Sequence, residues 1–243
     1  MNLKVTESTV VTTIISSQEG RNTYEIRKDF VDLKGKTAVV VMLFPGTSYQ
    51  EILKADSTTQ SLINHVEELG IKRLRIVNLF SKVCSARMSV KNIQPDLENL
   101  EYIIEVMKEA EAKEYEWIIA WGNSMLTSKV TNRMKKKLVQ GIREYLPDVV
   151  LKQFMVDNLE DMQNQGALHP LFLKIRYSSS SWHLDNYSTP KEMLLPDEDD
   201  KKEKQEQKKL ENLKEQQGTK EESLTDKVKK QQTKANTKYD IQD

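Results

Sequence analysis

Four short signatures at or just beyond predicted strand ends contain residue types that could do chemistry. They are Phe44-Pro45-Gly46, Asn78, Trp121-Gly122 and His169-Pro170. An Asn amide offers both a hydrogen-bond donor and an acceptor, and a His ring can donate or accept a proton near neutral pH. The carboxyl ends of parallel strands form the crevice of an open α/β sheet, so we expect the signatures to converge on one site.

Each signature also has a structural interpretation. Asn78 could satisfy backbone groups at a strand end, and His169 could be a loop residue that bonds locally. Trp121 could fill space at the sheet edge while Gly122 allows the turn into the next helix. The sequence leaves both interpretations open.

Apolar patterning predicts the elements that position these residues. A hairpin is predicted at 10–15 and 24–30, and residues 37–44 form a continuous apolar run typical of a strand buried on both faces. Further parallel strands are predicted at 74–79, 117–121 and 149–156.

Helices are predicted between these strands. One begins at Asp56 or Ser57 and ends at Gly70, the next begins at Pro95-Asp96, and the third is capped by Asn123 or Ser124. This order predicts an α/β fold, a three-layer αβα arrangement with a central, mostly parallel sheet of about four strands.

Composition predicts one α/β domain, residues 1–190, followed by a charged low-complexity tail, residues 191–243. The 243 residues include 37 Lys and Arg and 37 Asp and Glu, a balance that argues neither for nor against a nucleic-acid partner. From 197 onward the chain is almost wholly polar, which predicts disorder or a frayed helix. The tail could be a solubilising extension or an arm that binds a protein partner.

The cysteine content and the hydropathy of the chain argue against disulfide-bonded, metal-binding, exported and membrane-spanning proteins. The one cysteine, Cys84, cannot form an internal disulfide, and no Cys/His cluster has metal-ligand spacing. We therefore expect no metal and no cofactor. The first 15 residues do not resemble a signal peptide and no apolar run reaches membrane-spanning length, so we expect a cytoplasmic protein without membrane contact.

The order of the signatures resembles an uncharacterised bacterial and phage family, the domain-of-unknown-function family 1643. That family has the motifs MLNPS, D-x-T, NLF, WG and HPLY in this order. The matching strings here are 41–48, 55–58, 77–80, 120–122 and 169–172, and the resemblance covers about residues 22–176.

A more distant resemblance, also in motif order, is to the uracil-DNA glycosylases. It implies that Asn78 reads a base and that His169 is catalytic, donating to the departing base, while Leu171 or Phe172 wedges into the space left by an extruded base. The residues implied to contact substrate are Phe44, Pro45, Gly46, Asn78, Phe80, Trp121, Gly122 and Pro170.

Phe44 departs from both patterns. The uncharacterised family usually has Asn here, and the glycosylases commonly have Asp or Asn to position water, which a phenyl ring cannot do. Asp56 is the nearest carboxylate that could replace the missing group in catalysis, although its position also predicts a helix N-cap. The Phe44 ring could instead stack on a base.

Two groups could bind phosphate. Thr47 and Ser48 offer hydroxyls and backbone amides, and the third predicted helix carries a basic cluster that could also be a solvated face. The cluster consists of Lys129, Arg133, Lys135, Lys136, Lys137 and Arg143.

Three functions are consistent with these observations. The first is a glycosylase-like enzyme that cleaves an N-glycosidic bond in DNA or a nucleotide. The second is a non-catalytic nucleic-acid or nucleotide binding module, which Phe44 favours. The third is an interaction protein of a phage or mobile element that uses the tail.

Overall fold

The computed structural model describes residues 1, 3–84, 89–157 and 167–195. The chain divides into two units, Met1–Leu194 and Leu195–Asp243. The predicted disordered or helical tail, apart from its first residues, lies outside the described residues.

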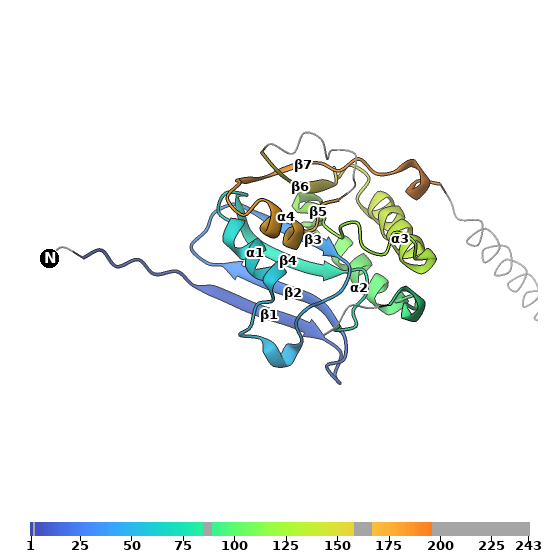
Figure 1. Cartoon of the computed structure of the whole chain (residues 1–243), viewed down its shortest axis with the longest axis horizontal. Helices are drawn as coiled ribbons and strands as arrows, with labels where there is room; N and C mark the ends of the chain where they lie inside the picture. Colours follow the sequence, from blue (N-terminus) through green and yellow to red (C-terminus); the bar gives the residue numbers. More distant parts are fainter. Residues whose placement is uncertain (2, 85–88, 158–166, 196–243) are drawn as a thin grey trace, which may run out of the picture. The chain divides into compact units, whose positions relative to one another are not determined.

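A mixed sheet of seven strands lies at the centre of the first unit (Figure 1), in the order β1-β2-β4-β3-β5-β6-β7. Its four middle strands, β4, β3, β5 and β6, are parallel, and β1, β2 and β7 pair antiparallel at the two edges. The prediction of about four strands was therefore too low. The strands are β1 (Val10–Ser16), β2 (Thr23–Phe30), β3 (Lys36–Met42), β4 (Ile71–Asn78), β5 (Glu116–Ile119), β6 (Lys152–Val156) and β7 (Trp182–Asn186).

The predicted hairpin, β1 and β2, continues the main sheet because β2 pairs with β4. A buried ion pair reinforces the junction: Arg75 Nε and Nη2 lie 2.8 and 2.7 Å from the two carboxylate oxygens of Glu25. Burial opposes ionisation of Glu25, but Arg75 and Arg27 outweigh it and hold the pKa of this carboxyl below its usual value. Arg75 also bonds Glu109, just beyond α2 (Leu97–Met107), so one guanidinium joins β2, β4 and this segment.

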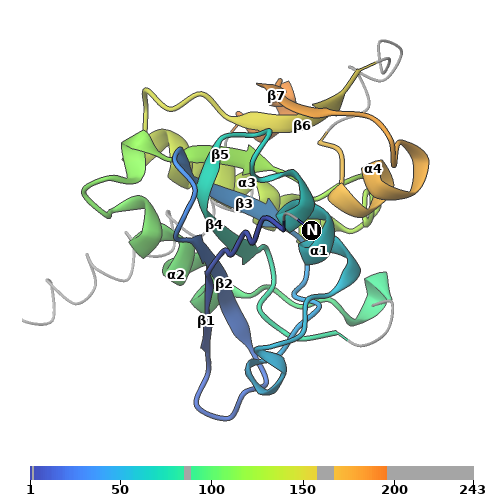
Figure 2. The same cartoon turned by 90° about the vertical axis from the view of Figure 1, so that its left-hand side faces the viewer.

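Helices cover both faces of the sheet (Figures 1 and 2), as the three-layer prediction required. On one face, α2 and α3 (Lys129–Tyr145) bury residues against Val39, Val41 and Trp117. On the other face, α1 (Ser57–His65) and α4 (Pro170–Arg176) pack against Val40 and Ile76. Short 3-10 turns complete the connections at Tyr49–Glu51, Val90–Asn92, Ala112–Glu114 and Lys191–Met193.

Two predicted helix boundaries were wrong. The third helix begins at Lys129 and is capped by Ser128, whose Oγ accepts a hydrogen bond from the Thr131 amide, and neither Asn123 nor Ser124 is its cap. Both lie in a turn that also contains Met125 at φ +64°, a left-handed conformation that an α-helix cannot accommodate. The first helix ends at His65, five residues before Gly70.

Candidate functional site

The candidate site lies at the carboxyl edge of the parallel strands, where two glycine turns approach two helix N-caps. A Cβ added to Gly46 would lie 2.8 Å from Oδ2 of Asp56, the cap of α1. A Cβ added to Gly122 would lie 2.9 Å from the Cβ of His169, the cap of α4. The turns after β3 and β5 therefore contact the starts of the two helices that cover one face of the sheet.

Asp56 is held by four hydrogen bonds. Its Oδ1 accepts from the amides of Thr58 and Thr59, which confirms the predicted N-cap. Its Oδ2 accepts from the hydroxyls of Thr47 and Thr59. The contacts favour a structural role in which Asp56 fixes the Gly46-Thr47 turn, and its predicted catalytic role has no support from them.

His169 is held as a neutral ring with a defined tautomer. Its Nδ1 accepts a hydrogen bond of 3.2 Å from the Leu171 amide, so the ring proton is on Nε2. Burial lowers the pKa of His169 below its ordinary 6.5, although the negative charge of Asp56 opposes this shift. At neutral pH the ring is therefore a fixed hydrogen-bond donor through Nε2.

Asn78 at the end of β4 is fully buried, and neither its Nδ2 nor its Oδ1 has a hydrogen-bond partner in the described part of the chain. The interpretation that its side chain satisfies backbone groups is therefore not supported within this part. An unpaired buried amide costs about 1–3 kcal/mol. A group retained at such a cost requires an explanation, and a bound ligand is one.

Asn78 faces the same layer as His169. Its register partner on β3 is Met42, which packs in the cluster that contains α1 and α4 residues. Side chains alternate along a strand, so Asn78 shares the side of Ile76, which belongs to the same cluster. Both predicted reactive side chains therefore belong to the α1/α4 side of the sheet.

A pocket of about 350 Å³ opens beside His169. Its wall includes Gly122, Asn123, Leu168 and Phe172, and its volume is within the range of small-ligand sites. Phe172, one of the two predicted wedge residues, is half-buried in this wall. Asn78 does not line this pocket, and Phe44 and Phe80 line a different one, so among the residues that the structure describes the four signatures do not meet in one open cavity.

Aromatic residues at the edge occupy two environments. Phe44 stacks on Phe80, with ring centroids 5.0 Å apart and an angle of 16° between the planes. Trp121 is almost fully buried and packs edge-on against Tyr187, which favours its structural interpretation. Gly122 has φ +64° and makes the predicted turn.

The residues predicted to bind phosphate do not form one continuous surface. The Thr47 hydroxyl is directed to Asp56, and Ser48 is a half-buried cap of a 3-10 turn. Lys129 is exposed and Arg133 is half-buried one turn further along α3. Pro45 and Pro170 are both buried; Pro45 lies in the loop after β3, and Pro170 is the first residue of α4.

Lys135, counted above in the basic cluster, is instead a core residue. It is only 1% exposed, and its Nζ lies over the Trp121 ring, 5.0 Å from the centroid. Burial lowers its pKa to about 8. Helical spacing could have revealed this, because Thr131, Met134, Lys135 and Leu138 fall at i, i+3, i+4 and i+7 and form one buried face.

Sequence reasoning also missed a second pocket, of about 260 Å³, beside Phe44 and Phe80. Asn22 and Lys82 meet there through an isolated bridge between two loops. The sequence contains only a weak signal for this pocket, because Asn22 and Lys82 are 60 positions apart in the chain and neither belongs to a recognisable motif.

The described residues contain neither a cluster suited to a metal ion nor a helix suited to span a membrane. Within them, no group of three or more His, Cys, Asp or Glu side chains could hold a metal ion. None of the helices in these same residues combines the length and apolar character needed to cross a membrane.

Fold and site together define an α/β protein with an open mixed sheet and a candidate pocket at its carboxyl edge. The sequence profile described as "Protein of unknown function (DUF1643)" matches residues 24–171. The chain therefore belongs to this family, as the order of its motifs had indicated.

Other comparisons add little to this assignment. None of the curated proteins matches the sequence significantly. Among solved structures, a crystal structure of a double mutant of the esterase rPPE matches with 10% identity and a TM-score of 0.33. The match covers 79% of this chain and 57% of the esterase chain, so this protein spans little more than half of its length. Similarity at this level carries no argument about function.

Proposed function

We propose that the carboxyl edge of the sheet binds a nucleobase, either in nucleic acid or in a nucleotide. The observation that carries the proposal is the unpaired, fully buried amide of Asn78 on the same side of the sheet as a neutral His169. The amide can pair with both a donor and an acceptor on the edge of a base. It is covered in this structure, so binding requires the covering side chains to move.

His169 can add a chemical step to this recognition. When an N-glycosidic bond breaks, the electron pair of the bond remains on the base, and negative charge spreads to its carbonyl oxygen. A hydrogen bond from Nε2 of His169 to that oxygen would stabilise the departing base. The Leu171 amide supports this role, because it fixes the ring proton on Nε2.

Binding without hydrolysis is the second candidate. Phe44 stands where related proteins have a polar residue, and its ring stacks on Phe80. The Asp56 carboxylate already accepts four hydrogen bonds. Neither residue is suited to activate water, so this observation favours a binding module.

A substrate screen distinguishes the two candidates. The purified protein is incubated with single- and double-stranded DNA containing uracil or modified bases, and both binding and formation of abasic sites are measured. His169→Ala is expected to reduce cleavage by at least about a hundredfold while the protein remains folded. Binding that survives in His169→Ala, with no abasic product from the wild type, would instead support the binding module.

Asn78→Leu supplies an independent test, because it should abolish base binding without lowering the stability of the protein. Leucine has a similar size and removes the unpaired polar group, so we expect the free energy of unfolding to stay constant or rise by about 1–2 kcal/mol. Base binding should be lost in the same variant. His183→Ala, which changes a half-exposed histidine on β7, is the matched control and should affect neither property.

A further inference from the structure

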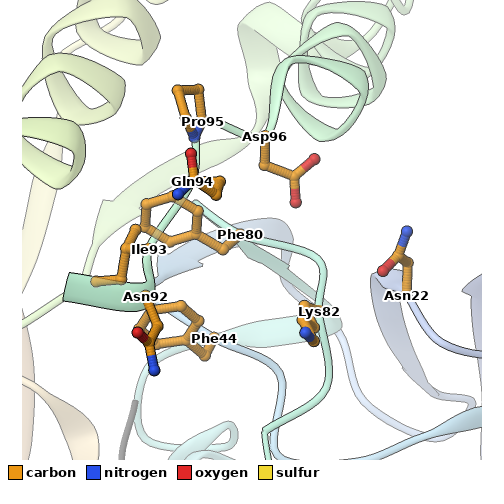
Figure 3. Close-up of a pocket in the computed structure, with 9 residues that line it drawn as sticks. All are labelled: Asn22, Phe44, Phe80, Lys82, Asn92, Ile93, Gln94, Pro95 and Asp96. Carbon is orange, nitrogen blue, oxygen red and sulfur yellow. The ribbon is translucent and has the colours of Figure 1, made fainter. Parts of the chain in front are cut away.

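The second pocket at this edge, here called the Phe44–Phe80 pocket, combines an aromatic wall with a polar rim. Figure 3 shows the stacked rings of Phe44 and Phe80 on one side and Asn22, Lys82 and Asp96 across from them. Gln94, which is exposed, also lines the pocket beside Phe80. The pocket lies where β3 and β4 end, where β2 begins and where the chain enters α2.

The chemistry of this pocket suits a planar, polar ring. Phe44 is half-buried and Phe80 is almost fully buried, so the aromatic wall is fixed and partly open. Asn22 and Gln94 carry amides, which both donate and accept hydrogen bonds as base edges do. Aromatic contact combined with amides is a recurring means of holding bases of single strands without strict selectivity.

The two charged side chains at the rim differ in whether they can contact a ligand. Asp96 caps α2, and its oxygens accept from the amide and hydroxyl of Ser81 and from the amide of Asn99. Lys82 is exposed, and in the part of the chain that the structure describes its ammonium forms no ion pair. A free cation beside an aromatic pocket is suited to a backbone phosphate.

The position of the pocket relates it to the candidate site. The His169 pocket lies beyond β5, and the Phe44–Phe80 pocket lies beyond β3 and β4; β3 separates β4 from β5 in the sheet. Strands in a sheet are about 5 Å apart, so the two strand ends are separated by roughly 10 Å. Phe44 borders the Phe44–Phe80 pocket, and Gly46, two residues further along the chain, approaches Asp56, the cap of α1. The pockets lie against opposite faces of the sheet, because Phe80 belongs to the α2/α3 cluster and Leu168 to the α1/α4 cluster. A ligand that fills both pockets must therefore be longer than one nucleotide and cross the carboxyl edge of the sheet.

We propose that the Phe44–Phe80 pocket binds the base of a second nucleotide in the same strand, so that the protein acts on single-stranded nucleic acid in preference to a free nucleotide. This inference rests on the proposed function, because it takes the Asn78/His169 site as the place of the first base. Lys82 contacts the phosphate near the second base, and Gln94 and Asn22 contact its edge.

The test compares two sizes of probe on the full chain. Equilibrium binding is measured for the deoxynucleoside monophosphates, including dUMP, and for short single-stranded oligodeoxynucleotides that carry the same base between thymidines. We expect the oligonucleotide with the preferred base to bind at least about tenfold more tightly than its monophosphate. Replacing the flanking bases with abasic residues should remove most of this difference, because the phosphates remain and the stacking partner does not.

Two variants locate the second base. Lys82→Ala and Gln94→Ala should each reduce oligonucleotide affinity about three- to tenfold and leave monophosphate affinity unchanged. Lys91→Ala is the matched control, since Lys91 is an exposed lysine on the neighbouring 3-10 turn. An equal loss in Lys91→Ala and Lys82→Ala would indicate diffuse electrostatic attraction and would overturn the inference.

The outcomes separate this inference from the function on which it rests. If monophosphates bind and depend on Asn78 and His169, but oligonucleotides bind no more tightly, the second pocket is wrong and the base site stands. If no monophosphate and no oligonucleotide binds, both proposals are overturned.

Discussion

Replacement of the buried Lys135 by methionine should stabilise the protein at neutral pH. Lys135 is 1% exposed, and its described neighbour at the ammonium is the Trp121 ring, 5.0 Å from Nζ. Burial lowers its pKa from 10.5 to about 8. At 1.36 kcal/mol per pKa unit, keeping the lysine charged in the folded protein at pH 7 costs about 3 kcal/mol.

The net gain is smaller because the Trp121 ring attracts the cation. Such contacts contribute about 0.5–2 kcal/mol, so we expect Lys135→Met to raise the free energy of unfolding by about 1–3 kcal/mol at pH 7. Methionine matches the length of the lysine stem and fills the same space.

The gain should decrease as the pH rises. Between pH 8 and 10.5 the unfolded chain holds the lysine proton that the folded chain has released, so wild-type stability increases with pH in this window. The wild type therefore approaches the variant, and the part of the difference due to charge should fall below about 1 kcal/mol at pH 10.

Urea unfolding at pH 7 and pH 10 measures both effects. Lys129→Met, which changes an exposed lysine of the same helix, is the control and should alter stability by no more than about 0.5 kcal/mol at either pH. Destabilisation of Lys135→Met at pH 7 would show that the ammonium has an anionic partner in solution and would refute the reasoning.

Three further predictions concern the site and the sheet. Gly122→Ala and Gly70→Ala both place a side chain at φ +64°, but only Gly122→Ala brings a Cβ to 2.9 Å from the Cβ of His169. We expect the free energy of unfolding to fall by about 1 kcal/mol in Gly70→Ala, and to fall further, with impaired base binding, in Gly122→Ala. Equal effects of the two substitutions would contradict the role of this contact. A ¹⁵N NMR titration should find the Nε2–H tautomer of His169 and a pKa below 6.5. Because the pKa is lower in the folded protein than in the unfolded chain, this group reduces the stability of the protein as the pH falls through 6.5. An Nδ1–H tautomer would refute the assignment. Glu25→Gln should destabilise the fold by about 1–3 kcal/mol in thermal or urea unfolding, because it removes the buried anion from Arg75, which keeps only the partly exposed Glu109. An unchanged stability would mean that the pair does not join the hairpin to the sheet.

The parts of the fold with strong local signals were predictable from the sequence. The apolar run of β3 predicted a central strand, Asp56 predicted a helix N-cap, and Pro95-Asp96 predicted the start of the next helix. The family membership followed from the order of the motifs. The strand and the helix starts depend on residues close together in the chain, and the family membership depends on the order of motifs between residues 41 and 172.

The missed features depend on tertiary contacts. Strand β7 is short and presents mainly Trp182 to the core, so its sequence lacks the alternation of a half-buried strand. Helix α4 is capped by His169, an unusual cap residue, although Pro170 at the first helical position was a usable signal. The Phe44–Phe80 pocket and the unpaired state of Asn78 arise from packing between distant segments, which no local pattern encodes.

Base binding by wild type, Asn78→Leu and His169→Ala tests the central claim most directly. Affinities for oligodeoxynucleotides that carry each natural base, uracil or a modified base are measured alongside the stability of each protein. The structure predicts that at least one base binds and that both variants, while folded, lose at least about tenfold in affinity. Equal binding by all three proteins, or no binding of any base by the wild type, would contradict the account.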